Sequence, residues 1–224
     1  DRPPSDADKT SINTAAGSAQ GFGTNLVYNA TFDAGLDGWY SVGTKAPNIS
    51  KAADRWSFPN WRYTCWELYV AAPPTSGYLR IYGSAPLNYY DVVAGQKYEA
   101  SVYIHAHRMQ NARIWIQWVD SAGSHISYST GNAVQISDKT IDRPDQMDRV
   151  FVMGTAPSNA VKARILYGAD FLNTTQSSCY LWLYKPMFAE AAPEQTKVSP
   201  WNRGIDTKET GADKTEDHTA KNII

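Results

Sequence analysis

Alternating apolar and polar residues, interrupted by turn residues, recur along most of this 224-residue chain and constrain its fold more than any other feature. Extended chain places successive side chains on opposite faces, so such alternation predicts strands. Strands are predicted at 65–71, 78–83, 97–105, 112–119, 124–129, 147–155, 161–168 and 179–189. No stretch between them shows the apolar period and caps of a helix. The chain is therefore predicted to be all-β, as a sandwich or barrel.

Length and charge exclude several classes of protein. The length allows one sandwich with flanking segments, or two small domains. The net charge of −1 argues against a dedicated nucleic-acid binder, and no apolar run approaches the ~20 residues that span a bilayer. The N-terminus is too polar for a signal peptide, and because the chain begins at Asp1 we expect a piece of a longer protein. Cys65 and Cys179 allow one disulfide.

The segment Asn25–Tyr40, NLVYNATFDAGLDGWY, marks the start of the folded part. It is predicted to begin as a strand with Leu26 and Tyr28 on one face, and then to turn at its Asp and Gly residues. Phe32 and Trp39 are predicted to be core residues.

This segment resembles the opening of carbohydrate-binding modules of families 4, 9, 16 and 22, which show Asn-Leu, Asn, Phe-Glu/Asp and Gly-Trp at similar spacing. A second match is Gly95–Ser101, GQKYEAS, which resembles the Pro-Gly-x-x-Tyr-x-x-Ser strand of these families with Ala94 in place of Pro. The resemblance implies a jelly-roll β-sandwich that binds glycans without cutting them.

Many members of these families also hold a structural calcium ion. Asp33 lies where the first acidic ligand would be, but Tyr184-Lys185-Pro186 replaces the Asp expected in the last strand. This departure argues against calcium. His105 and His107 share a strand face but have no recognisable third ligand, so we predict neither a metal site nor a cofactor.

The two flanks, residues 1–24 and 201–224, have the polar composition of linkers, which leaves 25–200 as the predicted domain. They also share an approximate repeat, which suggests a module inserted into a repetitive region. The repeat pairs Ala7-Asp8-Lys9-Thr10 with Ala212-Asp213-Lys214-Thr215, and Thr14-Ala15 with Thr219-Ala220.

These flanks resemble the GAD-x-T segments that border inserted domains in tail-tip and tail-fibre proteins of tailed bacteriophages. The end of the domain, Tyr184–Glu190 followed by Pro200-Trp201-Asn202, resembles the closing strand of phage sandwich modules. The resemblance implies a virion tail protein that acts outside the cell at the host surface. Its implied partners are other tail proteins, two further copies in a homotrimer, and a bacterial surface glycan.

Strand alternation also identifies faces that point away from the core. In three strands such a face carries aromatic, basic and amide side chains, which suit stacking on a pyranose ring and hydrogen bonding to its hydroxyls. If the strands share a sheet, these residues form a shallow platform. They are Arg80 and Tyr82, Tyr103 and His105, and Arg113, Trp115 and Gln117. Alternation also places Tyr78 on the same strand face as Arg80 and Tyr82.

Alternatives remain open for these surfaces. The platform is a glycan site, a subunit interface or an ordinary solvated face. The segment Arg55–Trp66, with Trp56 and Trp61, is predicted to be a loop that either folds over the sandwich as a lid or presents its rings at the rim.

No catalytic motif is recognisable. A Gly-x-Ser-x-Gly elbow, a phosphate-binding loop and an HExxH motif are all missing from the sequence, so we do not expect an enzyme. The predicted function is reversible adhesion of a phage tail module to a bacterial surface polysaccharide. The alternatives are a structural spacer that packs against neighbouring tail subunits, and a glycoside hydrolase or its accessory domain.

Overall fold

The computed structural model describes residues 23–32, 35–58, 61–134 and 148–202, without the side chains of 52–58 and 61–64. The predicted linkers and Asp33 therefore lie outside the described residues, apart from residues at the domain border. The described strands are β1 (Trp39–Gly43), β2 (Ile49–Phe58), β3 (Trp61–Ala71), β4 (Tyr78–Gly83), β5 (Tyr90–Asp91), β6 (Lys97–His107), β7 (Met109–Val119), β8 (His125–Thr130), β9 (Asp148–Thr155), β10 (Lys162–Phe171) and β11 (Ser178–Glu190).

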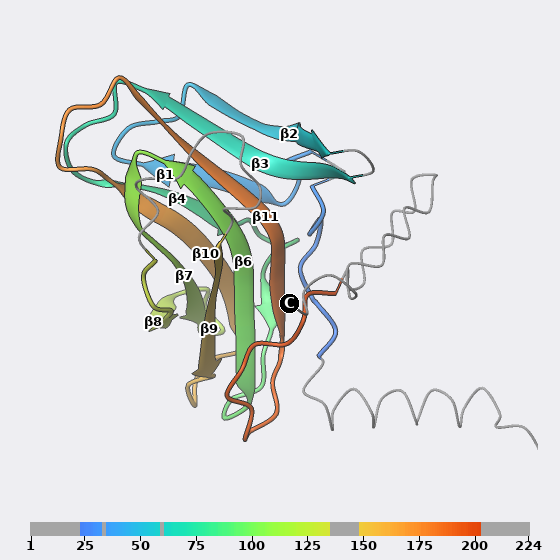
Figure 1. Ribbon diagram of the computed structural model, residues 1–224. Helices are drawn as coiled ribbons and strands as arrows, with labels where there is room; N and C mark the ends of the chain where they lie inside the picture. The colour runs from blue at the N-terminus through green and yellow to red at the C-terminus, as the bar shows by residue number, and fades with distance from the viewer. Residues whose placement is uncertain (1–22, 33–34, 59–60, 135–147, 203–224) are drawn as a thin grey trace, which may run out of the picture.

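The strands form two antiparallel sheets packed face to face (Figure 1). The first sheet has the order β1-β4-β10-β7-β8, with β5 also paired to β10, and the second has the order β2-β3-β11-β6-β9. This arrangement confirms the predicted fold class, an all-β sandwich. Among the described residues there is no helix that could cross a membrane.

Each strand predicted from alternation is present, with ends that differ by a few residues. Two predictions about local structure are wrong. The segment after Asn25 is not a strand, because the chain turns at Asn29 and Phe32, whose φ angles are 54° and 58°. The predicted loop Arg55–Trp66 is instead largely strand, since its described residues 55–58 and 61–66 belong to β2 and β3, in agreement with the preference of aromatic residues for strands.

Aromatic rings from both sheets meet in the core. Trp39 of β1 and Tyr167 of β10 belong to the first sheet, and their ring centroids lie 5.7 Å apart. Trp66 of β3, in the second sheet, lies 6.4 Å from Trp39, and Phe32 lies about equally close to both tryptophans, at 6.0 and 6.1 Å. Phe32 and Trp39 are buried, as predicted.

Asn25 ties the two ends of the domain to β11. Its side-chain oxygen accepts a hydrogen bond from Phe188 N (3.0 Å), and its Nδ2 donates to Pro186 O (3.1 Å) and Asn202 O (3.0 Å). Asn202 in turn accepts from Asn25 N (2.9 Å) and donates to Gly23 O (3.0 Å). The chain therefore arrives at the sandwich and leaves it at one place.

The two cysteines, both within the described residues, are buried thiols and do not form a disulfide. Burial raises the pKa of the Cys179 thiol to about 12.

We expect Asn25→Ala to lower the free energy of unfolding by about 2–4 kcal/mol, because it leaves buried backbone groups without partners. Denaturant titration measures the change, and Asn132→Ala, at an exposed asparagine, is the control. Equal stabilities of the two variants would contradict a fastening role for Asn25.

We expect iodoacetamide at pH 8 to alkylate Cys179 very slowly in the folded protein, because burial and the raised pKa of its thiol suppress the reactive thiolate. Mass spectrometry of the Cys179 peptide follows the reaction, and the protein unfolded in guanidinium chloride is the control. Alkylation of folded and unfolded protein at one rate would show that the thiol is accessible.

Candidate functional site

Five of the predicted binding residues lie together on the outer face of the first sheet, the face turned away from the second. Strand register places them in adjacent rows. Across β10, Tyr82 and Trp115 both pair with Leu166, and Arg80 and Arg113 both pair with Gly168. Gln117 is in the next row, opposite Arg164.

Structural neighbours outside the predicted binding residues complete this surface, which we call the arginine–aromatic face. Tyr40 of β1 pairs with Tyr82, and their rings stack with centroids 5.5 Å apart. The face consists of Tyr40, Tyr78, Arg80, Tyr82, Arg113, Trp115, Gln117, Tyr128, Arg164 and Asp170.

The side chain of Arg80 extends from β4 across β10, and its guanidinium is held by several contacts. Its guanidinium lies 4.8 Å from the ring centroids of both Tyr78 and Trp115, and it forms a 2.5 Å ion pair with Asp170. The crossing depends on Gly168, because a Cβ there would approach Arg80 Cδ to 2.6 Å. Arg80 therefore serves as a rigid support for the aromatic rings on either side of it.

Arg164 joins the neighbouring row in a similar way. It donates hydrogen bonds to Gln117 Oε1 and to Tyr40 Oη, the latter at 2.9 Å. Its guanidinium also lies over the rings of Tyr82 and Tyr89, at 4.9 and 5.2 Å. Partial burial raises the pKa of the Tyr82 hydroxyl above its ordinary value.

The accessible rings lie around the edges of the face. Tyr40, Tyr78 and Tyr128 are 38%, 44% and 45% exposed. Trp115, which the sequence places at the centre of the platform, is half-buried beside Arg80. Stacking area for a ligand is therefore provided mainly by the tyrosines, while Trp115 holds the arginines in place.

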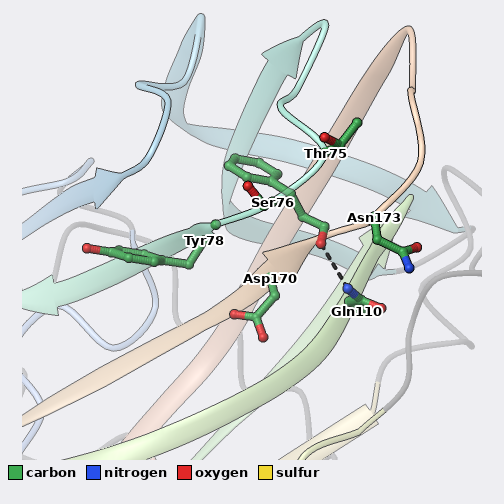
Figure 2. A pocket seen from close by; sticks show the side chains of 8 residues that line it. Thr75, Ser76, Tyr78, Gln110, Asp170 and Asn173 are labelled. Atoms are coloured by element: carbon green, nitrogen blue, oxygen red, sulfur yellow. Dashed lines mark hydrogen bonds between the residues drawn. The ribbon is translucent and has the colours of Figure 1, made fainter.

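A pocket of about 380 Å³ continues the face at the ends of β4, β7 and β10 (Figure 2). Tyr78 and Asp170 belong to both surfaces. Gln110 Nε2, in the pocket wall, donates to Phe171 O at 2.9 Å, the dashed line in Figure 2. The lining residues are Thr75, Ser76, Gly77, Tyr78, Gln110, Asp170, Phe171 and Asn173.

The remaining predicted residues do not join this face. Tyr103 and His105 belong to β6, in the second sheet, so the single predicted platform is wrong as an arrangement. His105 is fully buried against Trp182, at a centroid distance of 5.1 Å, and Tyr103 lies under Arg149. The side chains of Trp56 and Trp61 lie outside the described residues.

One of the overlooked residues has a sequence signal. Arg164 alternates with Ala163, Ile165 and Tyr167, all buried, so the period that identified Arg113 also points to Arg164. Asp170 has no such signal, because its contact with Arg80 exists only through the pairing of β10 with β4.

The chemistry of the face is that of recognition. It presents apolar tyrosine rings with polar edges, fixed guanidinium groups, and amide and carboxylate oxygens. Among the described residues no group of three or more His, Cys, Asp or Glu side chains could hold a metal ion.

No protein-family model and no curated protein sequence matches this chain. Solved structures with the same fold do exist. One is the enzymatically active domain of tailspike protein 4 of bacteriophage CBA120, with a TM-score of 0.54 and 13% identity. The match covers 75% of this chain and 21% of the tailspike chain, so this chain spans about a fifth of that protein.

A second similar structure is the CBM22-1 xylan-binding domain from Paenibacillus barcinonensis Xyn10C, with a TM-score of 0.50 and 13% identity. The match covers 76% of this chain and 96% of that domain. At these identities the likeness concerns the fold alone, and it agrees with the two-sheet arrangement: the chain has the β-sandwich fold of carbohydrate-binding modules.

Proposed function

We propose that the arginine–aromatic face binds a glycan and that the chain is a non-catalytic carbohydrate-binding module. The observation that carries this proposal is the set of exposed tyrosines held around a fixed arginine framework. The Arg80 guanidinium stacks on the Tyr78 ring, and Arg164 donates a hydrogen bond to the Tyr40 hydroxyl. Aromatic rings with fixed orientation match the C–H faces of sugars and lose little entropy on binding.

The fold supports the same proposal, since one similar structure is a xylan-binding domain. The pocket at the ends of β4, β7 and β10 adds hydroxyl, amide and carboxylate groups within reach of Tyr78. A hydrophobic surface with a few convergent polar groups is the usual composition of a ligand site.

The biological setting we infer is the tail of a bacteriophage, where the module attaches the virion to a bacterial surface polysaccharide. Support comes from the repeated flanks, from the similarity of the domain end to phage modules and from the likeness to a phage tailspike domain. A shallow site binds weakly, because sugar hydroxyls exchange one set of hydrogen bonds for another. Several copies on one virion, as in a homotrimer, supply avidity.

We expect Tyr78→Ala to weaken binding to a recognised polysaccharide about tenfold, because the exposed ring contributes roughly 1–1.5 kcal/mol of stacking. A glycan array and a panel of bacterial surface polysaccharides find the ligand, and affinity electrophoresis measures the loss. The control is Phe151→Ala, which removes a ring of similar exposure (43%) from the second sheet.

If Tyr78→Ala and Phe151→Ala bind the polysaccharide equally tightly, this face is not the binding site. No binding to any glycan, combined with self-association that is lost on Tyr78→Ala, would instead indicate a structural spacer. Release of reducing ends from the polysaccharide would show that the module is an enzyme.

A further inference from the structure

We propose that the arginine–aromatic face selects acidic glycans, chains that carry carboxylate or phosphate groups. This inference rests on the proposed function and specifies the ligand class of the same face. The observation behind it is the charge of the face, in which two arginines have no carboxylate partner among the described residues.

Two of the cations on this sheet are neutralised. Arg80 forms its ion pair with Asp170, and Lys162 pairs with Asp91 at 2.7 Å at the far end of β10. These pairs contribute no net charge to a ligand that approaches the face.

Arg164 carries a positive charge that no carboxylate of the described residues compensates. Its hydrogen-bond acceptors are the neutral oxygens of Gln117 and Tyr40, and its stacking partners are the tyrosines Tyr82 and Tyr89. These contacts hold the guanidinium in a defined orientation without compensating its positive charge.

Arg113 is the second cation that no carboxylate of the described residues compensates. Its guanidinium lies 5.9 Å from the Trp115 ring centroid, and its Nε is buried with no hydrogen-bond partner. The side chain as a whole remains partly exposed. The buried Nε cannot reach a ligand, so recognition falls to the rest of the guanidinium, whose positive charge is attracted more strongly to a carboxylate or phosphate than to a neutral hydroxyl.

This positive charge is local. The whole chain has a net charge of −1, so general attraction to polyanions is not expected from its composition. The planar guanidinium group accepts carboxylate and phosphate in the same forked geometry, so the two anions share one recognition chemistry.

The experiment compares glycans that differ only in charge, with the full chain. Polygalacturonate and its methyl ester test carboxylate; phosphorylated and unmodified dextran test phosphate. We expect at least one charged form to bind about tenfold more tightly than its neutral partner. The preference should shrink in 0.5 M NaCl because salt screens exposed charges.

Arg113→Gln tests the residue, since glutamine keeps a hydrogen-bonding amide but removes the charge. We expect it to reduce affinity for the preferred acidic glycan about tenfold and to leave the neutral partner unaffected. Lys197→Gln, which removes an exposed charge from the C-terminal segment, is the control and should change neither affinity. A thermal melt checks that each variant is folded. If a variant unfolds, the affinities of the unaltered chain for charged and neutral glycans still test the proposal.

The outcomes separate the two proposals. Equal affinity for charged and neutral forms overturns selection of acidic glycans while glycan binding stands. Equally tight binding of polyglutamate shows attraction to any polyanion and also overturns it. If no polysaccharide of any charge binds, in this experiment or on the glycan array, the proposed function itself fails.

Discussion

Packing of aromatic rings between the two sheets is the constraint on which the rest of this structure depends. Trp39 and Tyr167 from one sheet meet Trp66 from the other. Since side chains alternate along a strand, once these rings point inward their neighbours must point outward. Tyr40 follows Trp39, and Arg164 precedes Ile165 by one position. The composition of the outer face is thus set by the same period that builds the core.

This dependence explains how far the sequence could predict the site. The non-core orientation of Arg80, Arg113 and Trp115 was predictable, because alternation is a local property of each strand. The sheet to which a strand belongs is not local. β6 and β7 are adjacent in sequence, yet the chain reverses at Arg108 (φ 58°) and enters the opposite sheet. The outward residues of β6, Tyr103 among them, are therefore separated from Trp115 by the whole sandwich.

Long-range pairing also changes what individual residues do. Trp115 has the ring type and the strand position of a sugar-stacking residue. In the folded chain, however, the Arg80 side chain passes over Gly168 of β10 and its guanidinium lies on the Trp115 ring. Asn25 opens a motif predicted to be a strand, and its side chain instead supplies hydrogen bonds to backbone groups 161 and 163 residues away. In both cases the residue type indicated that the position matters to the domain. What the side chain does there depends on long-range contacts that exist only in the folded chain.

The fastening of the domain ends has a mechanical consequence. Because Asn202 and Gly23 are joined by a 3.0 Å hydrogen bond, a pull on the two ends acts first on the bonds around Asn25 and Asn202. The strands bear force only after these bonds part. A protein that carries this module in its backbone therefore gains almost no contour length from it at low load, and extends only after the fastening and then the strand pairs have separated.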